Sequence, residues 1–359
     1  MANNLCAAFS PSLPGRPALN RHTLSAAICL AILTALFLFP ATPRASEPPS
    51  LISVADSRGK VLTFERPVER IVCLIESALS GLYMLDAGGK VVGVSANIYK
   101  PPVFDWYAAL DERIRRKRLP APGNWDFISI EGVIALRPDV VIAWAEQGEA
   151  IAALEERGIK VFGVFLKSKE DVYREMFSLG AMTGTQARAR ELVAYTQGEL
   201  ERIARRIALI PAARRPVVYY MWAQGPLETS CGASTVDDLI TLAGGRNACG
   251  AFSREHMLAN LEQVLAWNPE LIVMWGNDRL DPADIIADPR WRMTRAVKER
   301  RVHELPEVFL CDLWTLKFAY AVKVMATWCH PPGFTDLDLE AERRAMLARL
   351  YGSKLGALD

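Results

Sequence analysis

Aromatic and polar side chains follow several apolar runs of the chain, at the points where strands are expected to end. Trp144 directly follows the run 140–143, and Trp275 directly follows the run 271–274. The other members of this set are Tyr99, Lys100, Trp125, Trp222 and Gln224. Ligands of α/β sheets lie outside the carboxyl ends of the strands, and aromatic walls with a few polar groups are typical of ligand clefts. The set therefore predicts a binding cleft, although core packing is the commoner role of a single tryptophan.

The other tryptophans of the chain carry no such positional signal. They are assigned to packing: Trp106, Trp267, Trp291, Trp314 and Trp328.

Signatures of catalysis are missing from the sequence. It contains no G-x-x-x-x-G-K-[ST], G-x-G-x-x-G, H-E-x-x-H or G-x-S-x-G motif. His256, His303 and His330 are not at metal-ligand spacing. A binding protein without catalytic residues, metal ligands or a cofactor is expected. The remote alternative is a metal-cluster or chelatase-like enzyme on a similar fold, kept open by Cys311 close to Trp314.

An internal repeat indicates which elements position the cleft residues. The segment 131–144 reads EGVIALRPDVVIAW, and 262–275 reads EQVLAWNPELIVMW, at a constant offset of 131 residues. In each copy a short amphipathic helix is expected to end before Pro138 or Pro269, because the residue before proline disfavours the helical conformation. The apolar run that follows is typical of a strand buried on both faces of a parallel sheet. The repeat therefore predicts two lobes of similar build.

The segment Thr185–Ile210 separates these lobes. Its apolar residues recur at helical spacing up to Pro211, which predicts one helix of about 37 Å. We therefore expect an α/β protein with two Rossmann-like lobes, joined by a single long backbone helix, with the ligand cleft between them. The expected boundaries are residues 50–184 for the N-terminal lobe, 185–211 for the helix, and 212–359 for the C-terminal lobe with a helical tail.

The N-terminus has the pattern of a secretory signal peptide. The uncharged run Leu24–Phe39 follows Arg16 and Arg21 and precedes small residues near Ala45. A membrane anchor is the alternative, but a span needs roughly 20 apolar residues. Removal of residues 1–46 changes the formal net charge of the chain from +1 to −2, with 39 Lys and Arg against 41 Asp and Glu. A monomeric periplasmic protein that binds no nucleic acid is expected, because nucleic-acid binders normally show a basic excess.

Five cysteines remain after residue 46, which is too few for a disulfide scaffold. The odd number leaves at least one thiol unpaired in an oxidising compartment. Cys231 and Cys249 are candidates for a bridge, although sequence alone does not establish the pairing.

The order and spacing of several segments resemble the class III periplasmic solute-binding proteins of ABC importers. The resemblance covers about residues 53–320 and rests on 56–59, 67–72, 91–95, 130–144, 244–247, 261–275 and 291–306. It implies two lobes around one rigid helix, and one surface glutamate per lobe, here Glu131 and Glu262, that docks onto arginines of the permease. A helix N-terminal acid stabilised by the helix dipole is the structural alternative for both.

The same resemblance suggests ligand classes. Its members carry iron-siderophores, haem, vitamin B12 and, in some cases, molybdate or tungstate. It places Trp125, Trp144 and Trp222 at aromatic contact positions of the B12-binding member, and Tyr99 near a loop that supplies a haem-iron tyrosinate. The tail 314–351 is more like the iron-complex and molybdate types. We expect a receptor that delivers an iron chelate to a permease and its ATPase, with cobalamin or molybdate/tungstate as the alternative ligand.

Overall fold

The computed structural model describes residues 51–276 and 279–356. The expected signal peptide, with its apolar run 24–39, lies outside these residues. Within the described ranges, no helix has both the length and the apolar character needed to cross a membrane.

A parallel sheet in the strand order β4-β3-β5-β6 forms the N-terminal lobe. Every residue of β3 and β6 is buried, as the continuous apolar runs predict. The strands are β3 (Ile71–Cys73), β4 (Val91–Val94), β5 (Val140–Trp144) and β6 (Val161–Val164), preceded by an antiparallel pair, β1 (Ile52–Ala55) and β2 (Val61–Phe64). The helices are α2 (Glu76–Met84), α3 (Phe104–Leu110), α4 (Glu112–Arg115), α5 (Ile130–Ala135), α6 (Gly148–Glu155) and α7 (Lys169–Thr183).

A second parallel sheet, in the order β12-β11-β7-β9, forms the C-terminal lobe. Its strands are β7 (Val217–Met221), β9 (Arg246–Asn247), β11 (Leu271–Met274) and β12 (Val302–Glu304), with a short antiparallel pair, β8 (Glu228–Thr229) and β10 (Met257–Leu258). The helices are α9 (Thr235–Leu242), α10 (Leu261–Trp267), α11 (Pro282–Ala287) and α12 (Arg295–Lys298). Cys231 and Cys249 form a disulfide in this lobe, whereas Cys73, Cys311 and Cys329 are buried free thiols.

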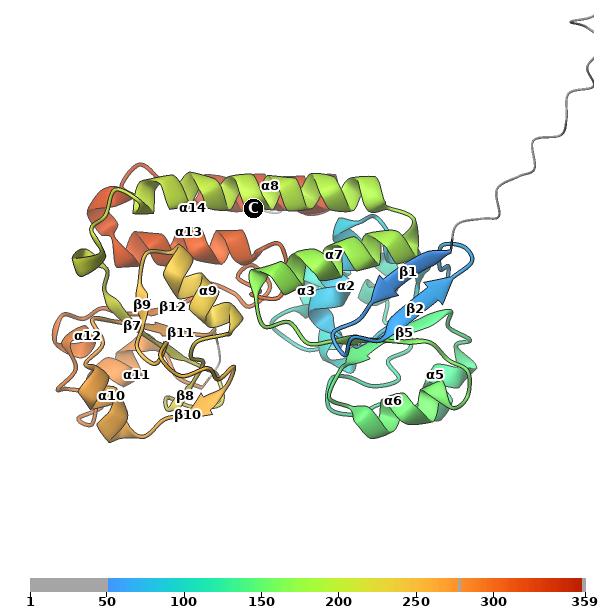
Figure 1. Cartoon of the computed structure of the whole chain (residues 1–359), viewed down its shortest axis with the longest axis horizontal. Helices are drawn as coiled ribbons and strands as arrows, with labels where there is room; N and C mark the ends of the chain where they lie inside the picture. Colours follow the sequence, from blue (N-terminus) through green and yellow to red (C-terminus); the bar gives the residue numbers. More distant parts are fainter. Residues whose placement is uncertain (1–50, 277–278, 357–359) are drawn as a thin grey trace, which may run out of the picture. The chain divides into compact units, whose positions relative to one another are not determined.

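The long helix α8 (Gln186–Ile207) contains 22 residues, close to the predicted extent. Figure 1 shows it running above α7 of the first lobe and above α13 (Phe318–Cys329) of the second. The mixed α/β fold with two parallel sheets confirms the expected fold class. The domain boundaries themselves stay a prediction.

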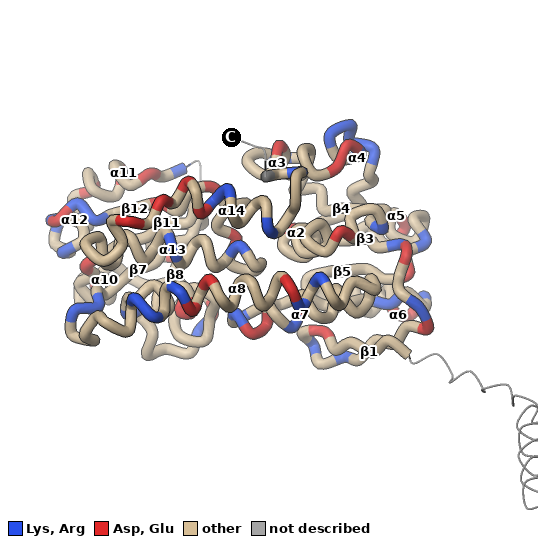
Figure 2. Tube along the Cα trace, turned by 90° about the horizontal axis from the view of Figure 1, so that it is seen from above, with Lys and Arg blue, Asp and Glu red and all other residues tan. Residues whose placement is uncertain are grey.

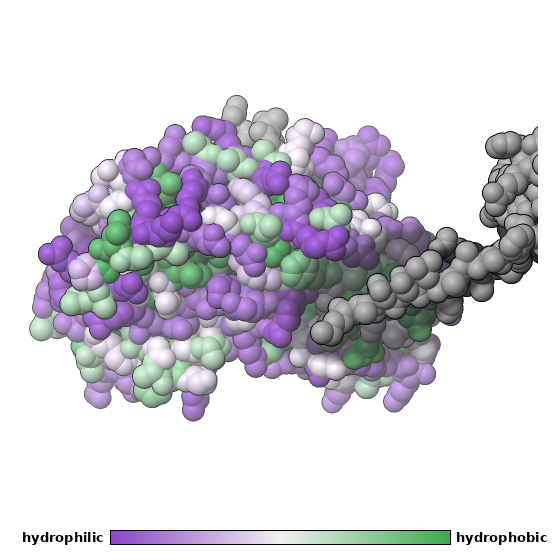
Figure 3. Space-filling view, turned by 45° about the horizontal axis from the view of Figure 1, so that its top comes forward, coloured by the Kyte–Doolittle hydropathy of each residue, from purple (hydrophilic) through white to green (hydrophobic). Residues whose placement is uncertain are grey.

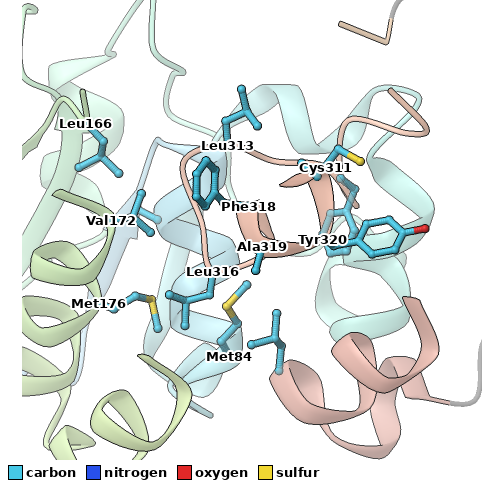
Figure 4. Packing of buried hydrophobic residues seen from close by; sticks show 14 of the residues in the cluster. Met84, Leu166, Val172, Met176, Cys311, Leu313, Leu316, Phe318, Ala319 and Tyr320 are labelled. Atoms are coloured by element: carbon cyan, nitrogen blue, oxygen red, sulfur yellow. The ribbon is translucent and has the colours of Figure 1, made fainter. Parts of the chain in front are cut away.

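The C-terminal tail returns to the N-terminal lobe, which the sequence did not reveal. Helices α14 (Leu339–Tyr351) and α15 (Ser353–Gly356) contact α2 and α3. The hydroxyls of Tyr351 and Ser80 are hydrogen-bonded, and the Nζ of Lys317 donates to the Oγ of Ser80 at 3.0 Å. Figure 4 shows side chains of the segment 311–320 packed with Met84 of α2 and with Val172 and Met176 of α7. The tail therefore joins the two lobes a second time.

The surface carries both charge signs throughout. Figure 2 shows Lys and Arg interspersed with Asp and Glu along α8 and over both lobes. The face seen in Figure 3 mixes hydrophilic residues with smaller groups of hydrophobic ones.

Both copies of the repeat form the predicted helix and strand, α5–β5 and α10–β11. Arg137 and Asn268, 131 residues apart, both have a φ of 46° in the turn before the proline. The chain therefore leaves each helix through the same left-handed turn, which directs the following strand into its sheet.

Candidate functional site

A cavity of about 540 Å³ lies at the carboxyl ends of both sheets. In the N-terminal lobe, its lining comes from the segments that follow β3, β4 and β6 and from the end of β5. In the C-terminal lobe, its lining comes from the segments that follow β7, β11 and β12, together with the loop before β10. Because both lobes line it, the cavity is the cleft that the sequence places between them.

Three tryptophans of the C-terminal half form one wall of the cavity. The ring of Trp222 is stacked on that of Trp314, with centroids 5.8 Å apart and an interplanar angle of 9°. Trp275 packs against both rings, at 5.4 Å from Trp222 and 5.8 Å from Trp314. The Nε1 of Trp222 donates to the Oγ of the buried Ser230 at 2.8 Å, which fixes the ring orientation. We call Trp222, Trp275 and Trp314 the tryptophan wall.

The N-terminal lobe contributes aromatic rings to the same cavity. Trp144 contacts Phe165 edge-to-face, with centroids 4.8 Å apart. Trp125 also lines the cavity and is 48% exposed. Aromatic groups therefore line the cavity from both lobes, which suits a ligand with extended apolar or π surface.

Charged groups are fewer and mostly acidic. Glu76, Glu255 and Asp312 line the cavity, together with Lys100 and His256. The Nζ of Lys100 donates to the Oδ1 of Asn97 at 3.3 Å. Burial raises the pKa of the Glu255 and Asp312 carboxyls above their ordinary values.

The structure brings six of the seven predicted ligand-binding residues to this cavity. They are Lys100, Trp125, Trp144, Trp222, Gln224 and Trp275. Tyr99 is not among the lining residues: its hydroxyl donates to the carbonyl oxygen of Leu119 at 2.8 Å, and its ring lies beside Phe104. That hydrogen bond turns the phenol oxygen into the lobe, so a role for Tyr99 in contacting ligand is not supported.

Other lining residues were not predicted. Trp314 was assigned to packing; its ring does pack against Trp222 and Trp275, and it also lines the cavity, which the sequence did not predict. Asp312 and Trp314 lie beyond β12 rather than directly at its end, so strand ends did not signal them. Glu76 and Phe165 do follow β3 and β6 closely, and the rule that found Trp144 would have found them.

The expected docking residues occupy equivalent places on the two lobes. Glu131 and Glu262 lie in the first turns of α5 and α10 and are exposed. Each helix is capped by the preceding side chain, Ser129 accepting from the N–H of Gly132 and Asn260 from that of Gln263. In Figure 1, α5 and α10 lie on the side of the two lobes away from α8.

The structural repeat extends further toward the N-terminus than the sequence match. Trp125 and His256, 131 residues apart, both line the cavity. Phe127 and Leu258, again 131 residues apart, are 66% and 69% exposed. Each lobe therefore places a cavity residue, an exposed apolar side chain and an exposed acid on one short segment.

Buried ionisable groups lie beside the cavity. Glu175 is buried, its Oε1 has no hydrogen-bond partner, and burial raises its pKa to about 8. It lines a second cavity of about 440 Å³ that shares Phe165 and Leu166 with the first. Cys311, which kept an enzymatic alternative open, is fully buried, and burial raises the pKa of its thiol far above the ordinary value. Over residues 51–276 and 279–356, no cluster of three or more His, Cys, Asp or Glu side chains is arranged to hold a metal ion.

Comparisons with known proteins agree with this architecture. The sequence pattern of the family described as "Periplasmic binding protein" matches residues 71–308. The molybdate-binding protein MolA of Haemophilus influenzae is 24% identical over 314 residues, which cover 80% of this chain and 87% of that protein. Its molybdate-bound structure has a TM-score of 0.73 and covers 83% of this chain and 97% of that one.

Two further relatives have other named ligands. The vitamin B12-binding protein of Vibrio vulnificus is 24% identical over 206 residues, covering 57% of this chain and 70% of that protein. A Helicobacter pylori CeuE structure, described as a Ni-His complex, has a TM-score of 0.72 at 19% identity and covers 85% of this chain and 98% of that one. These proteins are binding proteins rather than enzymes, which confirms the expectation that the chain is not an enzyme.

Proposed function

Because the chain belongs to the periplasmic binding protein family, whose class III members are the solute receptors of ABC importers, we propose that its cavity binds an organic metal chelate of the iron-siderophore type. The observation that carries this proposal is the aromatic lining contributed by both lobes. The chain would work in the periplasm as a monomer, after removal of residues 1–46, and would deliver the chelate to a permease and its ATPase.

The size and chemistry of the cavity support an organic ligand. A volume of about 540 Å³ falls within the range of about 300–1,000 Å³ that is usual for small-molecule sites. Indole faces contribute dispersion and apolar burial, which a large organic frame can use. A small oxyanion gains little from them, because it needs converging hydrogen-bond donors and positive charge.

Within the chelates, the siderophore type is favoured over haem. The Tyr99 hydroxyl, the expected tyrosinate ligand of a haem iron, is bonded to Leu119 and does not line the cavity. His256 does line the cavity, but its Nε2 is 2.8 Å from the Oε2 of Glu228. A siderophore supplies the coordination of its iron itself and needs surface contact rather than a metal ligand from the protein. Cobalamin, the named ligand of one relative, stays the alternative because it is also a large organic chelate.

We also propose that Glu131 and Glu262 dock the receptor onto the permease. Both are exposed, one on each lobe, at equivalent positions of the repeat. Exposed acids of this kind pair with cations of a partner and steer its approach. Stabilisation of the helix N-terminus by the same carboxylates is compatible with docking.

Calorimetric titration of the purified protein lacking residues 1–46 tests the ligand proposal. The probes are a ferric trihydroxamate, haemin, cyanocobalamin and molybdate, with tryptophan fluorescence as a second readout. We expect one-to-one binding of the ferric siderophore, with quenching from the tryptophan wall. Binding of molybdate alone, or of none of the four, would overturn the proposal. Binding of cobalamin alone would replace the siderophore by the alternative ligand.

A further inference from the structure

Among the charged groups that line the cavity, carboxylates outnumber ammonium groups. Three carboxylates line it, Glu76, Glu255 and Asp312, and each comes from a different segment. Lys100 contributes an ammonium group to the same lining. His256, the remaining titratable group there, is paired with Glu228, which adds a further carboxylate behind it.

Two other nearby lysines, Lys317 and Lys167, are not among the residues that line this cavity. The Nζ of Lys317 forms an ion pair with Asp312 at 3.9 Å, which offsets part of the charge of that carboxylate, and it is fully buried 3.5 Å from the centroid of the Phe309 ring. Glu76 and Glu255 therefore carry most of the negative charge of the lining. Lys167 lies over the ring of Phe165, 4.6 Å from its centroid, and lines the neighbouring cavity instead. A solute at the tryptophan wall therefore meets more carboxylate than ammonium.

The carboxylates are held in place around this space. The side chain of Asp312 is 13% exposed, and its Oδ1 accepts from the N–H of Trp314, in the tryptophan wall, at 3.0 Å. The Oε1 of Glu76 accepts from the Oγ of Ser95 at 2.7 Å. Glu255 lies on the C-terminal side of the cavity, next to His256. Low-dielectric walls focus the field of such charges into a cleft.

The tryptophan wall adds a second, independent preference of the same sign. The face of an indole ring carries negative electrostatic potential and attracts cations. Aromatic faces and carboxylates thus both favour positive charge in the solute, and both disfavour an anion, which would lose its hydration without gaining donors.

We propose that the cavity selects metal chelates with a net positive charge or none, and discriminates against anionic ones. This inference rests on the proposed function and names its ligand class more closely. A ferric hydroxamate chelate fits this class. A ferric tris-catecholate, which is triply anionic, and molybdate do not.

A charge series on one chelate frame tests the inference. Ferrioxamine B carries a free ammonium group, its N-acetyl derivative is neutral, and its N-succinyl derivative is anionic at neutral pH. We expect the dissociation constant to rise along this series, by at least tenfold from the cationic to the anionic member. Added salt should weaken binding of the cationic member and leave that of the neutral one nearly unchanged.

Variants then connect the preference to its residues. Glu255→Gln should reduce the ratio between cationic and anionic affinities several-fold, and Glu76→Gln should act in the same direction. Glu201→Gln, an exposed acid of α8 outside the cavity, is the matched control and should leave the ratio unchanged. Asp312→Asn adds a third variant if it folds, but the test does not depend on it.

Failure of the charge selection and failure of the proposed function give different results in these titrations. Equal or tighter binding of the anionic derivative, or tight binding of a ferric tris-catecholate, would overturn the charge selection and leave an organic chelate as the solute. Tight binding of molybdate without any chelate, or no binding of any chelate, would overturn both. An unchanged ratio in Glu255→Gln and in Glu76→Gln would also overturn the assignment to these carboxylates.

Discussion

Trp314 is the residue whose truncation tests the tryptophan wall most sharply, because the sequence assigned it to packing and the structure placed it in the cavity. Its ring stacks on that of Trp222 and packs against that of Trp275. Truncation to alanine therefore removes one indole from the wall and takes a packing partner from each of the other two. Trp314→Ala is therefore expected to weaken binding of the chelate.

The size of the effect follows from the area that the ring offers. An indole buries roughly 150–250 Å², and we take about 50 Å² as the share that faces the solute. At about 25 cal/mol per Å², this share is worth about 1.3 kcal/mol. A hydroxamate chelate has no aromatic ring to stack on the indole, so this area share alone sets the effect, and about 1.3 kcal/mol corresponds to roughly a tenfold weaker dissociation constant.

Isothermal titration of Trp314→Ala, Trp314→Phe and Trp328→Leu with the same chelate measures this effect. The phenylalanine variant keeps a ring and should stay within about fivefold of the wild type, on the same area argument. Trp328 stacks on His303 and is not among the lining residues, so Trp328→Leu serves as the control for loss of an indole elsewhere. Affinity of Trp314→Ala within twofold of the wild type, with an unchanged circular dichroism spectrum, would refute the reasoning.

Four further predictions concern stability and docking. Lys323→Met should cost about 2 kcal/mol of unfolding free energy in urea titrations, because it removes the buried ammonium that pairs with Glu199 and Glu342 and leaves Arg202 as the remaining cation beside both carboxylates; an unchanged urea midpoint would contradict it. The pKa of Glu175 is raised to about 8 in the folded state, so the wild type should lose stability as pH rises from about 4.5 to about 8, while Glu175→Gln should lose less over the same range; parallel pH profiles would count against this. Reduction of the Cys231–Cys249 bridge, which closes a short loop, should cost about 3 kcal/mol in the same assay, and replacing both cysteines by serine should abolish the sensitivity to reductant. Glu131→Arg with Glu262→Arg should abolish stimulation of the permease–ATPase in proteoliposomes while leaving chelate affinity intact, Glu201→Arg being the control; loss of chelate affinity would instead indicate a structural role.

The elements that position the site were predictable because their signals are local. Parallel strands buried on both faces have continuous apolar sequences, which can be recognised in the chain. The proline at the same place in each repeat copy ends the preceding helix and indicates where β5 and β11 begin. The side chain that follows each strand then comes to the cavity by the geometry of the sheet, which is why Trp144 and Trp275 were found.

Long-range packing was not predictable in the same way. Nothing in the segment 305–356 signals that it returns to α2 and α3, because that contact depends on Ser80 and Lys317, far apart in the sequence. Asp312 and Trp314 reach the cavity through this return and were therefore missed. The equivalence of Phe127 with Leu258 was not found from the sequence, because the two residues differ in type. What they share is an exposed apolar side chain at the same place in each lobe, which only the structure shows.

The central claim is that an organic metal chelate lies against the tryptophan wall. A crystal structure of the protein with ferrioxamine B, with data collected at the iron absorption edge, tests it most directly. We expect one anomalous iron peak in the cavity, with the chelate frame in contact with Trp222, Trp275 and Trp314 and its ammonium group near Glu76, Glu255 or Asp312. An iron peak outside this cavity, or a chelate bound without contact to the tryptophan wall, would contradict it.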